Sequence, residues 1–158
     1  MKKMVGFIGM AFLLLMVACS SISQTETWQP TAITDIKSVA GKWEGHLIPD
    51  HYFTQNYDRA ILVIGDTGEC ETTLERTKTT AAGGQVSSSV IRVLDEKGKL
   101  VLTDGKLSAK FEKGGQATLQ LYVDPESGER ILKADARDYE GFTYSAELKR
   151  TGESASAK

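Results

Sequence analysis

The sequence is poor in the residues that build metal and covalent sites. Its 158 residues include two cysteines, Cys19 and Cys70, and two histidines, His46 and His51. Two thiols are too few for a zinc site that needs several thiolates, and the two histidines match no known metal-ligand spacing. We therefore expect no metal site and no cofactor.

The sequence also lacks an excess of basic charge and the motifs of common enzymes. It has 19 Lys and Arg against 21 Asp and Glu, without a basic run, and this excludes nucleic acid as an expected partner. No Gly-x-Ser-x-Gly elbow, His-Glu-x-x-His helix or Gly-rich phosphate loop occurs. The segments with alternating residues have almost wholly apolar inward faces, which gather no acid–base groups. We expect a protein that is not an enzyme.

The first residues, "MKKMVGFIGMAFLLLMVACSS", have the order of a secretory signal. Lys2 and Lys3 precede an apolar stretch at 4–17, and small residues follow before Cys19. This arrangement predicts a signal peptide over residues 1–18. The apolar stretch is too short for a transmembrane helix, which needs about 20 residues.

The segment "MVAC" resembles the bacterial lipobox. The resemblance implies that Cys19 is the lipid attachment site, receiving diacylglycerol and becoming the new N-terminus. Ser20 in place of aspartate implies sorting to the outer membrane, so we expect a lipid-anchored protein of the cell envelope that contacts the membrane through its N-terminal lipid. The alternative is an ordinary cleaved signal in which the cysteine has no role. Cleavage would remove Lys2 and Lys3, leaving 17 basic against 21 acidic residues and a net charge of −4.

Three further segments follow the signal peptide. Residues 19–33 are rich in Ser and Thr and contain Pro30, so they are predicted to form the lipidated N-terminus and a flexible tether. Residues 34–150 form one predicted β-barrel domain, in which Thr34 or Asp35 caps a helical turn ending near Gly41. Residues 151–158 have the composition of a disordered tail.

Apolar and polar residues alternate through most of this domain, as in Phe142, Tyr144, Ala146 and Leu148. This period of two is typical of antiparallel strands with one buried face. The segments "GDTGE", "DEKGK", "TDGK", "EKGGQ", "DPESGE" and "RDYEG" have turn composition, and "TKTTAAGGQ" is a longer link. The predicted strands are 42–48, 59–65, 69–77, 86–94, 99–104, 106–112, 116–123, 130–137 and 142–150. We expect an all-β fold, an antiparallel up-and-down meander that closes into a small barrel of about eight or nine strands.

The segment "GKWEG" at the first predicted strand resembles the calycin superfamily of lipocalins, fatty-acid-binding proteins and avidins. The resemblance implies that Trp43 is a structural plug across one end of the barrel. It also implies that a basic residue of the last strand, Lys149 or Arg150, stacks on its ring. Glycines beside the tryptophan would let strands cross closely.

The best candidate contact residues lie in "PDHYFTQNYDR", the longest predicted connection. Tyr52, Phe53 and Tyr57 in this loop are the candidates for binding a ligand or partner, because loops on a rigid scaffold commonly carry function. The alternative is that they pack over the barrel mouth as a lid. Cys70, between Glu69 and Glu71, is predicted to be a buried, unreactive thiol.

Two functions fit these expectations. The first is a non-catalytic, membrane-anchored barrel that binds a small apolar ligand or an envelope component. The alternative is a protein-interaction module, such as an inhibitor of secreted hydrolases or an envelope assembly accessory. The volume inside the barrel distinguishes them, because large inward side chains such as Phe111 and Tyr144 can fill a small barrel.

Overall fold

A computed structural model describes residues 28–50, 57–82 and 84–151. Within these ranges the chain forms a short 3₁₀ helix, η1 (Ile36–Val39), and nine strands. The strands are β1 (Gln29–Thr31), β2 (Gly41–Pro49), β3 (Arg59–Ile64), β4 (Glu69–Ala82), β5 (Gln85–Thr103), β6 (Lys106–Phe111), β7 (Gln116–Val123), β8 (Arg130–Arg137) and β9 (Thr143–Thr151).

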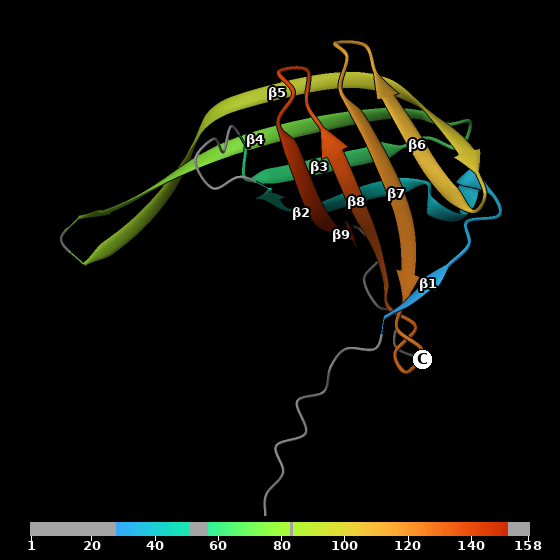
Figure 1. The fold of residues 1–158 in the computed structure, drawn as a ribbon. Helices are drawn as coiled ribbons and strands as arrows, with labels where there is room; N and C mark the ends of the chain where they lie inside the picture. The colour runs from blue at the N-terminus through green and yellow to red at the C-terminus, as the bar shows by residue number, and fades with distance from the viewer. Residues whose placement is uncertain (1–27, 51–56, 83, 152–158) are drawn as a thin grey trace, which may run out of the picture.

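The strands form one antiparallel sheet that closes on itself (Figure 1). Each strand from β2 to β9 pairs with the next along the chain, and β9 pairs back with β2. The small β1 pairs with the end of β7. The predicted all-β meander that closes into a barrel is therefore confirmed.

The alternation of residues separates a buried from a solvated face, as predicted. On β9, for example, Tyr144, Ala146 and Leu148 are buried, while the residues between them are half-buried or exposed. Inward side chains from all eight strands of the ring meet in one hydrophobic core. This burial of one face of every strand is the main source of stability for a barrel whose described cysteine, Cys70, is free.

The predicted break at "DEKGK" is wrong, because β5 runs without interruption from Gln85 to Thr103. Gly98 lies inside this strand and pairs with Cys70 on one side and Phe111 on the other. A Cβ atom at Gly98 would lie 2.8 Å from Cδ1 of Phe111 and 2.6 Å from the carbonyl oxygen of Lys110. The glycine therefore serves the close approach of a neighbouring strand and not a turn.

The predicted link "TKTTAAGGQ" is also wrong, because most of it belongs to strands. β4 and β5 remain paired from Thr77 opposite Val90 to Ala82 opposite Gln85, after a β-bulge between Arg76 and Thr77. The threonines and valines here are β-branched, and such residues favour extended strands. We call residues 77–82 and 85–91 the arm, because this hairpin projects from the barrel (Figure 1).

Strands and one buried residue of the barrel lie outside the predicted domain bounds of 34 and 150. Gln29, Pro30 and Thr31 pair with β7, and Ile33 is buried in the core, so this end of the predicted tether belongs to the barrel. At the other end Thr151 pairs with Lys42. The predicted signal peptide, Cys19 and residues 152–158 lie outside the described residues.

One end of the barrel, which we call the packed end, is built around Trp43. Asp35 caps η1 through its carboxylate, and the Trp43 side chain is 0% exposed beneath this turn. Trp43 Nε1 donates a hydrogen bond of 2.8 Å to the carbonyl oxygen of Val39. The guanidinium carbon of Arg150 lies 5.9 Å from the centre of the indole ring. The indole therefore has both a polar partner for its N–H and a cation on its face.

Replacement of Trp43 by alanine should lower the free energy of unfolding by about 3–5 kcal/mol, because a large buried side chain is lost and a cavity remains. Urea denaturation followed by circular dichroism measures this change. Trp43→Phe should lie between wild type and Trp43→Ala, and Tyr139→Ala, at a side chain 44% exposed, is the control. An unchanged unfolding midpoint in Trp43→Ala would remove the indole from the core.

Candidate functional site

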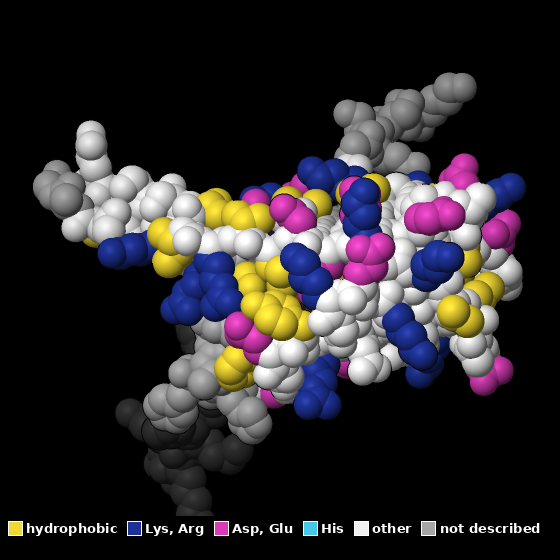
Figure 2. Space-filling view, turned by 90° about the horizontal axis from the view of Figure 1, so that it is seen from above, with side chains coloured by type: hydrophobic (Ala, Val, Ile, Leu, Met, Phe, Trp, Pro, Cys, Tyr) yellow, Lys and Arg dark blue, Asp and Glu magenta, His cyan; other side chains and the backbone are white. Residues whose placement is uncertain are grey.

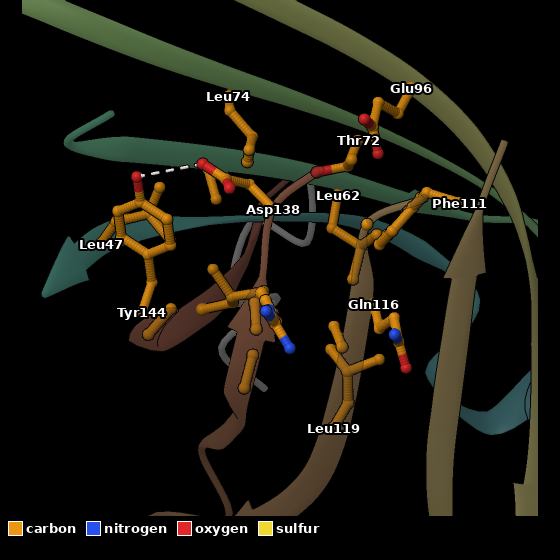
Figure 3. Close-up of a pocket in the computed structure, with 18 residues that line it drawn as sticks. Leu47, Leu62, Thr72, Leu74, Glu96, Phe111, Gln116, Leu119, Asp138 and Tyr144 are labelled. Atoms are coloured by element: carbon orange, nitrogen blue, oxygen red, sulfur yellow. Dashed lines mark hydrogen bonds between the residues drawn. The ribbon is translucent and has the colours of Figure 1, made fainter. Parts of the chain in front are cut away.

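We call the end of the barrel opposite Trp43 the mouth. The structural features that core packing does not explain lie at this end. It contains the connections 112–115 and 138–142, the start of the arm and the cavity drawn in Figure 3. The connection between β2 and β3 also belongs to this end. Its residues 51–56, including the candidates Tyr52 and Phe53, lie outside the described residues.

The cavity at the mouth is small and mainly apolar. Its volume is about 60 Å³, and most of its wall comes from inward side chains such as Leu47, Leu62, Leu74 and Leu119. Pockets for drug-sized ligands usually measure about 300–1,000 Å³. The enclosed space therefore suits a few water molecules or the tip of a ligand, and not a whole fatty acid.

Glu96 places a carboxyl group in this apolar surrounding. It lies on the inward face of β5, opposite Thr72 of β4, and is 5% exposed. Figure 3 shows its side chain directed toward the interior beside Thr72. No hydrogen bond reaches Oε1 of Glu96 within the part of the chain that the structure describes. A buried acceptor without a donor is costly, and it suggests a functional role.

The surroundings of Glu96 favour its protonated form. Burial raises the pKa of the carboxyl group above its ordinary value, and the nearby charge of Asp138 raises it further, whereas Lys113 lowers it. The carboxylate also lies against Gly115, where an added Cβ would come within 2.8 Å of Oε2. Sequence reasoning missed Glu96, because its segment has the polar composition of a turn.

Asp138, the second acid at the cavity, has partners for its carboxylate. Oδ1 accepts hydrogen bonds of 2.9 Å from the backbone amides of Glu140 and Phe142. Oδ2 accepts a hydrogen bond of 3.3 Å from the hydroxyl group of Tyr144. Asp138 therefore holds the connection 138–142 in shape, as aspartate does in many turns.

Tyr57, a candidate contact residue, is 1% exposed and part of the core. The guanidinium carbon of Arg92, at the base of the arm, lies 5.0 Å from the centre of its ring. Arg92 also forms an ion pair of 3.2 Å with Glu140. Burial raises the pKa of the Tyr57 hydroxyl group. Tyr57 thus packs beneath the junction of the arm and the connection 138–142 and does not face solvent.

The other residues considered in the sequence analysis are not part of the cavity. Cys70 is buried, and burial raises its thiol pKa to about 11, which opposes reactivity. His46 is exposed on β2. Among the described residues, no three His, Cys, Asp or Glu side chains are arranged to hold a metal ion.

These features define a closed antiparallel β-sheet protein with a packed end and a mouth. Comparison with known proteins finds no matching family model, no matching curated protein and no matching solved structure. Within residues 28–50, 57–82 and 84–151, no helix is long and apolar enough to span a membrane.

Glu96→Gln should make the protein more stable at neutral pH, by roughly 1 kcal/mol, because it removes a buried charge without a donor. The pKa of Glu96 lies above its ordinary 4.5 in the folded protein. The folded state therefore keeps this proton where the unfolded chain has lost it, and the stability that Glu96 contributes falls as the pH rises from about 4.5.

Urea denaturation of both proteins between about pH 4 and pH 8 measures this effect. The advantage of Glu96→Gln should grow with pH and then become constant above the raised pKa. Glu112→Gln, at an exposed residue nearby, should change stability by less than about 0.5 kcal/mol. If the advantage of Glu96→Gln is absent or does not vary with pH, the carboxyl group is not buried as described.

Proposed function

We propose that this protein is a non-catalytic, lipid-anchored component of the bacterial cell envelope that binds an acidic, extended segment of another envelope protein on its arm. The observation that carries the proposal is the arm itself. It is a two-stranded projection with unpaired strand edges, and its one charged residue, Lys78, is basic. The proposal takes the protein-interaction alternative, because the cavity is too small to enclose a ligand of ordinary size.

The anchoring part of the proposal rests on the lipobox resemblance around Cys19. The described chain begins at Trp28, and β1 pairs with the end of β7 that is remote from the mouth. Nine residue steps separate Cys19 from Trp28 and span at most about 32 Å. A lipid on Cys19 would therefore keep this side of the barrel near the membrane and leave the arm accessible to partners.

The arm has strand edges that no described strand covers. β3 pairs with β4 only as far as Glu75, and β6 pairs with β5 only from Gly98 onward. The amide of Thr77 donates a hydrogen bond of 2.9 Å to Oδ2 of Asp58, so residues 78–82 and 85–91 have one edge each that faces away from the hairpin. Unpaired N–H and C=O groups on such edges are a template for adding a strand from another chain.

The residues of the arm do not protect these edges. Natural edge strands are usually blocked by proline, several charges or inward-pointing charged residues. The arm contains no proline, and Lys78 is its one charged residue. Val86 and Val90 are exposed at 72% and 49%. An added strand could therefore pair with the backbone and also cover valine side chains.

The charge at the base of the arm favours an acidic partner. Residues 76–92 contain Arg76, Lys78 and Arg92 and no acidic residue, although the whole chain has a net charge of −2. Arg76 and Arg92 are directly opposite in the register, and Lys78 lies two residues along the same face. Like charges in opposite positions destabilise a sheet. Figure 2 shows the outer arm as mostly uncharged, with one basic side chain and no acidic side chain on the visible face.

This charge pattern also disfavours a second copy as the partner. Two arms joined edge to edge about a two-fold axis would place their basic faces next to each other. A partner segment with Asp or Glu at alternate positions would instead place its acids beside Arg76 and Lys78. The complementary charge would add specificity to the backbone pairing.

Site-specific photo-crosslinking in intact cells tests the proposal. A photoreactive residue at Ser88, on the arm, should give one discrete adduct with an envelope protein that contains an acidic segment. The same residue at Ser108, exposed on β6, should not give this adduct. Lys78→Glu should reduce the adduct by at least about tenfold, because like charges then face each other.

Two variants separate the parts of the proposal. Lys106→Glu makes the same change in charge at an exposed site away from the arm and should leave the adduct unchanged. Cys19→Ser should release the protein from the membrane or leave it as an uncleaved precursor. Adducts only with lipid or with a second copy, or an adduct insensitive to Lys78→Glu, would contradict the proposed partner. A mature, membrane-bound Cys19→Ser protein would contradict the anchor.

A further inference from the structure

We propose that the cavity at the mouth binds a primary alkylammonium group, with the carboxylate of Glu96 as its partner. This site is separate from the proposed protein contact, because the cavity lies inside the barrel and the unpaired edges of the arm lie outside it. The proposal therefore stands whether or not a protein binds the arm.

The first argument is the unsatisfied acceptor. Glu96 is more than nine-tenths buried, and its Oε1 receives no hydrogen bond from the described residues. Two other charged groups at this end have partners that offset their charge or their hydrogen-bonding need. Asp138 accepts from two amides and a tyrosine hydroxyl, and Arg92 is paired with Glu140. Oδ1 of Asp58 is also buried without a donor, but Oδ2 of the same carboxylate accepts two hydrogen bonds from Thr77, and Asp58 does not line the cavity.

The second argument is the sign of the charge in the cavity. Two carboxyl groups, those of Glu96 and Asp138, line the same space together with one cationic side chain, that of Arg137. Their mutual repulsion and the burial of Glu96 both disfavour an empty, ionised site. A bound cation removes both penalties, whereas a bound anion increases them. Opposite charges inside a low-dielectric space attract more strongly than at the surface.

The third argument is the shape and chemistry of the wall. Leucine and alanine side chains and Phe111 form most of the lining, and the cavity volume of about 60 Å³ admits only a narrow group. A primary ammonium group has three N–H donors. The methylenes attached to it can lie against the leucines, as the stem of a lysine does on apolar surface. A guanidinium or a quaternary ammonium group is wider, and the quaternary group has no N–H to donate.

The ammonium group can come from a free alkylamine or from a lysine side chain, and the experiment distinguishes these sources. The unfolding temperature of the full-length protein is measured with increasing n-propylammonium and, separately, with Nα-acetyl-lysine-N-methylamide. A ligand that binds only the folded state raises this temperature in a saturable way. The lysine derivative should bind more tightly if the natural source is a polypeptide, and n-propylammonium if it is a free amine.

Two comparison compounds and two variants show whether the effect belongs to Glu96. Propan-1-ol has a similar shape without the charge, and tetramethylammonium has the charge without a donor; both should bind at least about tenfold more weakly than n-propylammonium. Glu96→Gln should weaken n-propylammonium binding by at least about tenfold, because a charged hydrogen bond is lost. Glu112→Gln makes the same change at an exposed position and should not affect binding.

Three results would overturn the proposal. The first is no saturable effect of either amine, which would leave water as the occupant of the cavity. The second is an equal effect of propan-1-ol. The third is equal binding to wild type and Glu96→Gln. A loss of folding would not explain weaker binding by Glu96→Gln, because this variant is expected to be at least as stable as wild type.

Discussion

The pairing of β2 with β9 is the contact on which the rest of the molecule depends. It joins the first and last strands of the ring through eight register pairs, from Lys42 opposite Thr151 to Pro49 opposite Tyr144. Gly45 lies within this seam, and a Cβ atom there would come within 2.0 Å of the carbonyl oxygen of Glu147. No other residue type allows this approach without movement of the backbone. The segment "GKWEG" thus supplies both the glycine of the seam and the buried Trp43.

Closure gives the two ends of the barrel different properties. At the packed end, η1, Trp43 and Arg150 fill the space between the strands and leave few unsatisfied groups. At the mouth, β5 continues beyond its last contact with β6, and its two unusual features lie there. Glu96 is buried without a donor, and Arg92 faces Arg76 across the hairpin.

The buried oxygen of Glu96 without a donor is locally unfavourable, yet it lies in a fold whose other parts are mutually consistent. The inward alternation, the turns and the packed end all favour the same closed sheet. Natural proteins depart from such consistency mainly at functional sites. The proposed ammonium site uses this departure, and the proposed protein contact uses the strand edges of the arm. Both proposed binding sites lie at the end of the barrel that is remote from β1.

The sequence predicts the strands in which alternation is unbroken. β7 and β8 have the predicted limits, and β9 differs by one residue at each end. The prediction fails where the same residue type occurs both in turns and in strands. Gly98 allows a close strand approach but has the signature of a turn, and this reading also hid Glu96. The arm was missed because Thr, Ser and Gly occur both in loops and in exposed strands. β1 was missed because three residues are too few to show a period.

Amide hydrogen exchange in Gly45→Ala tests most directly whether closure through Gly45 organises the molecule. The amides of both β2 and β9 should lose protection together, because a Cβ atom at Gly45 separates the two strands. Gly65→Ala is the matched control, since its nearest contact would be an ordinary 3.4 Å, and it should keep wild-type protection. If Gly45→Ala keeps the protection of both strands, the seam tolerates the added atom and the barrel does not depend on this glycine.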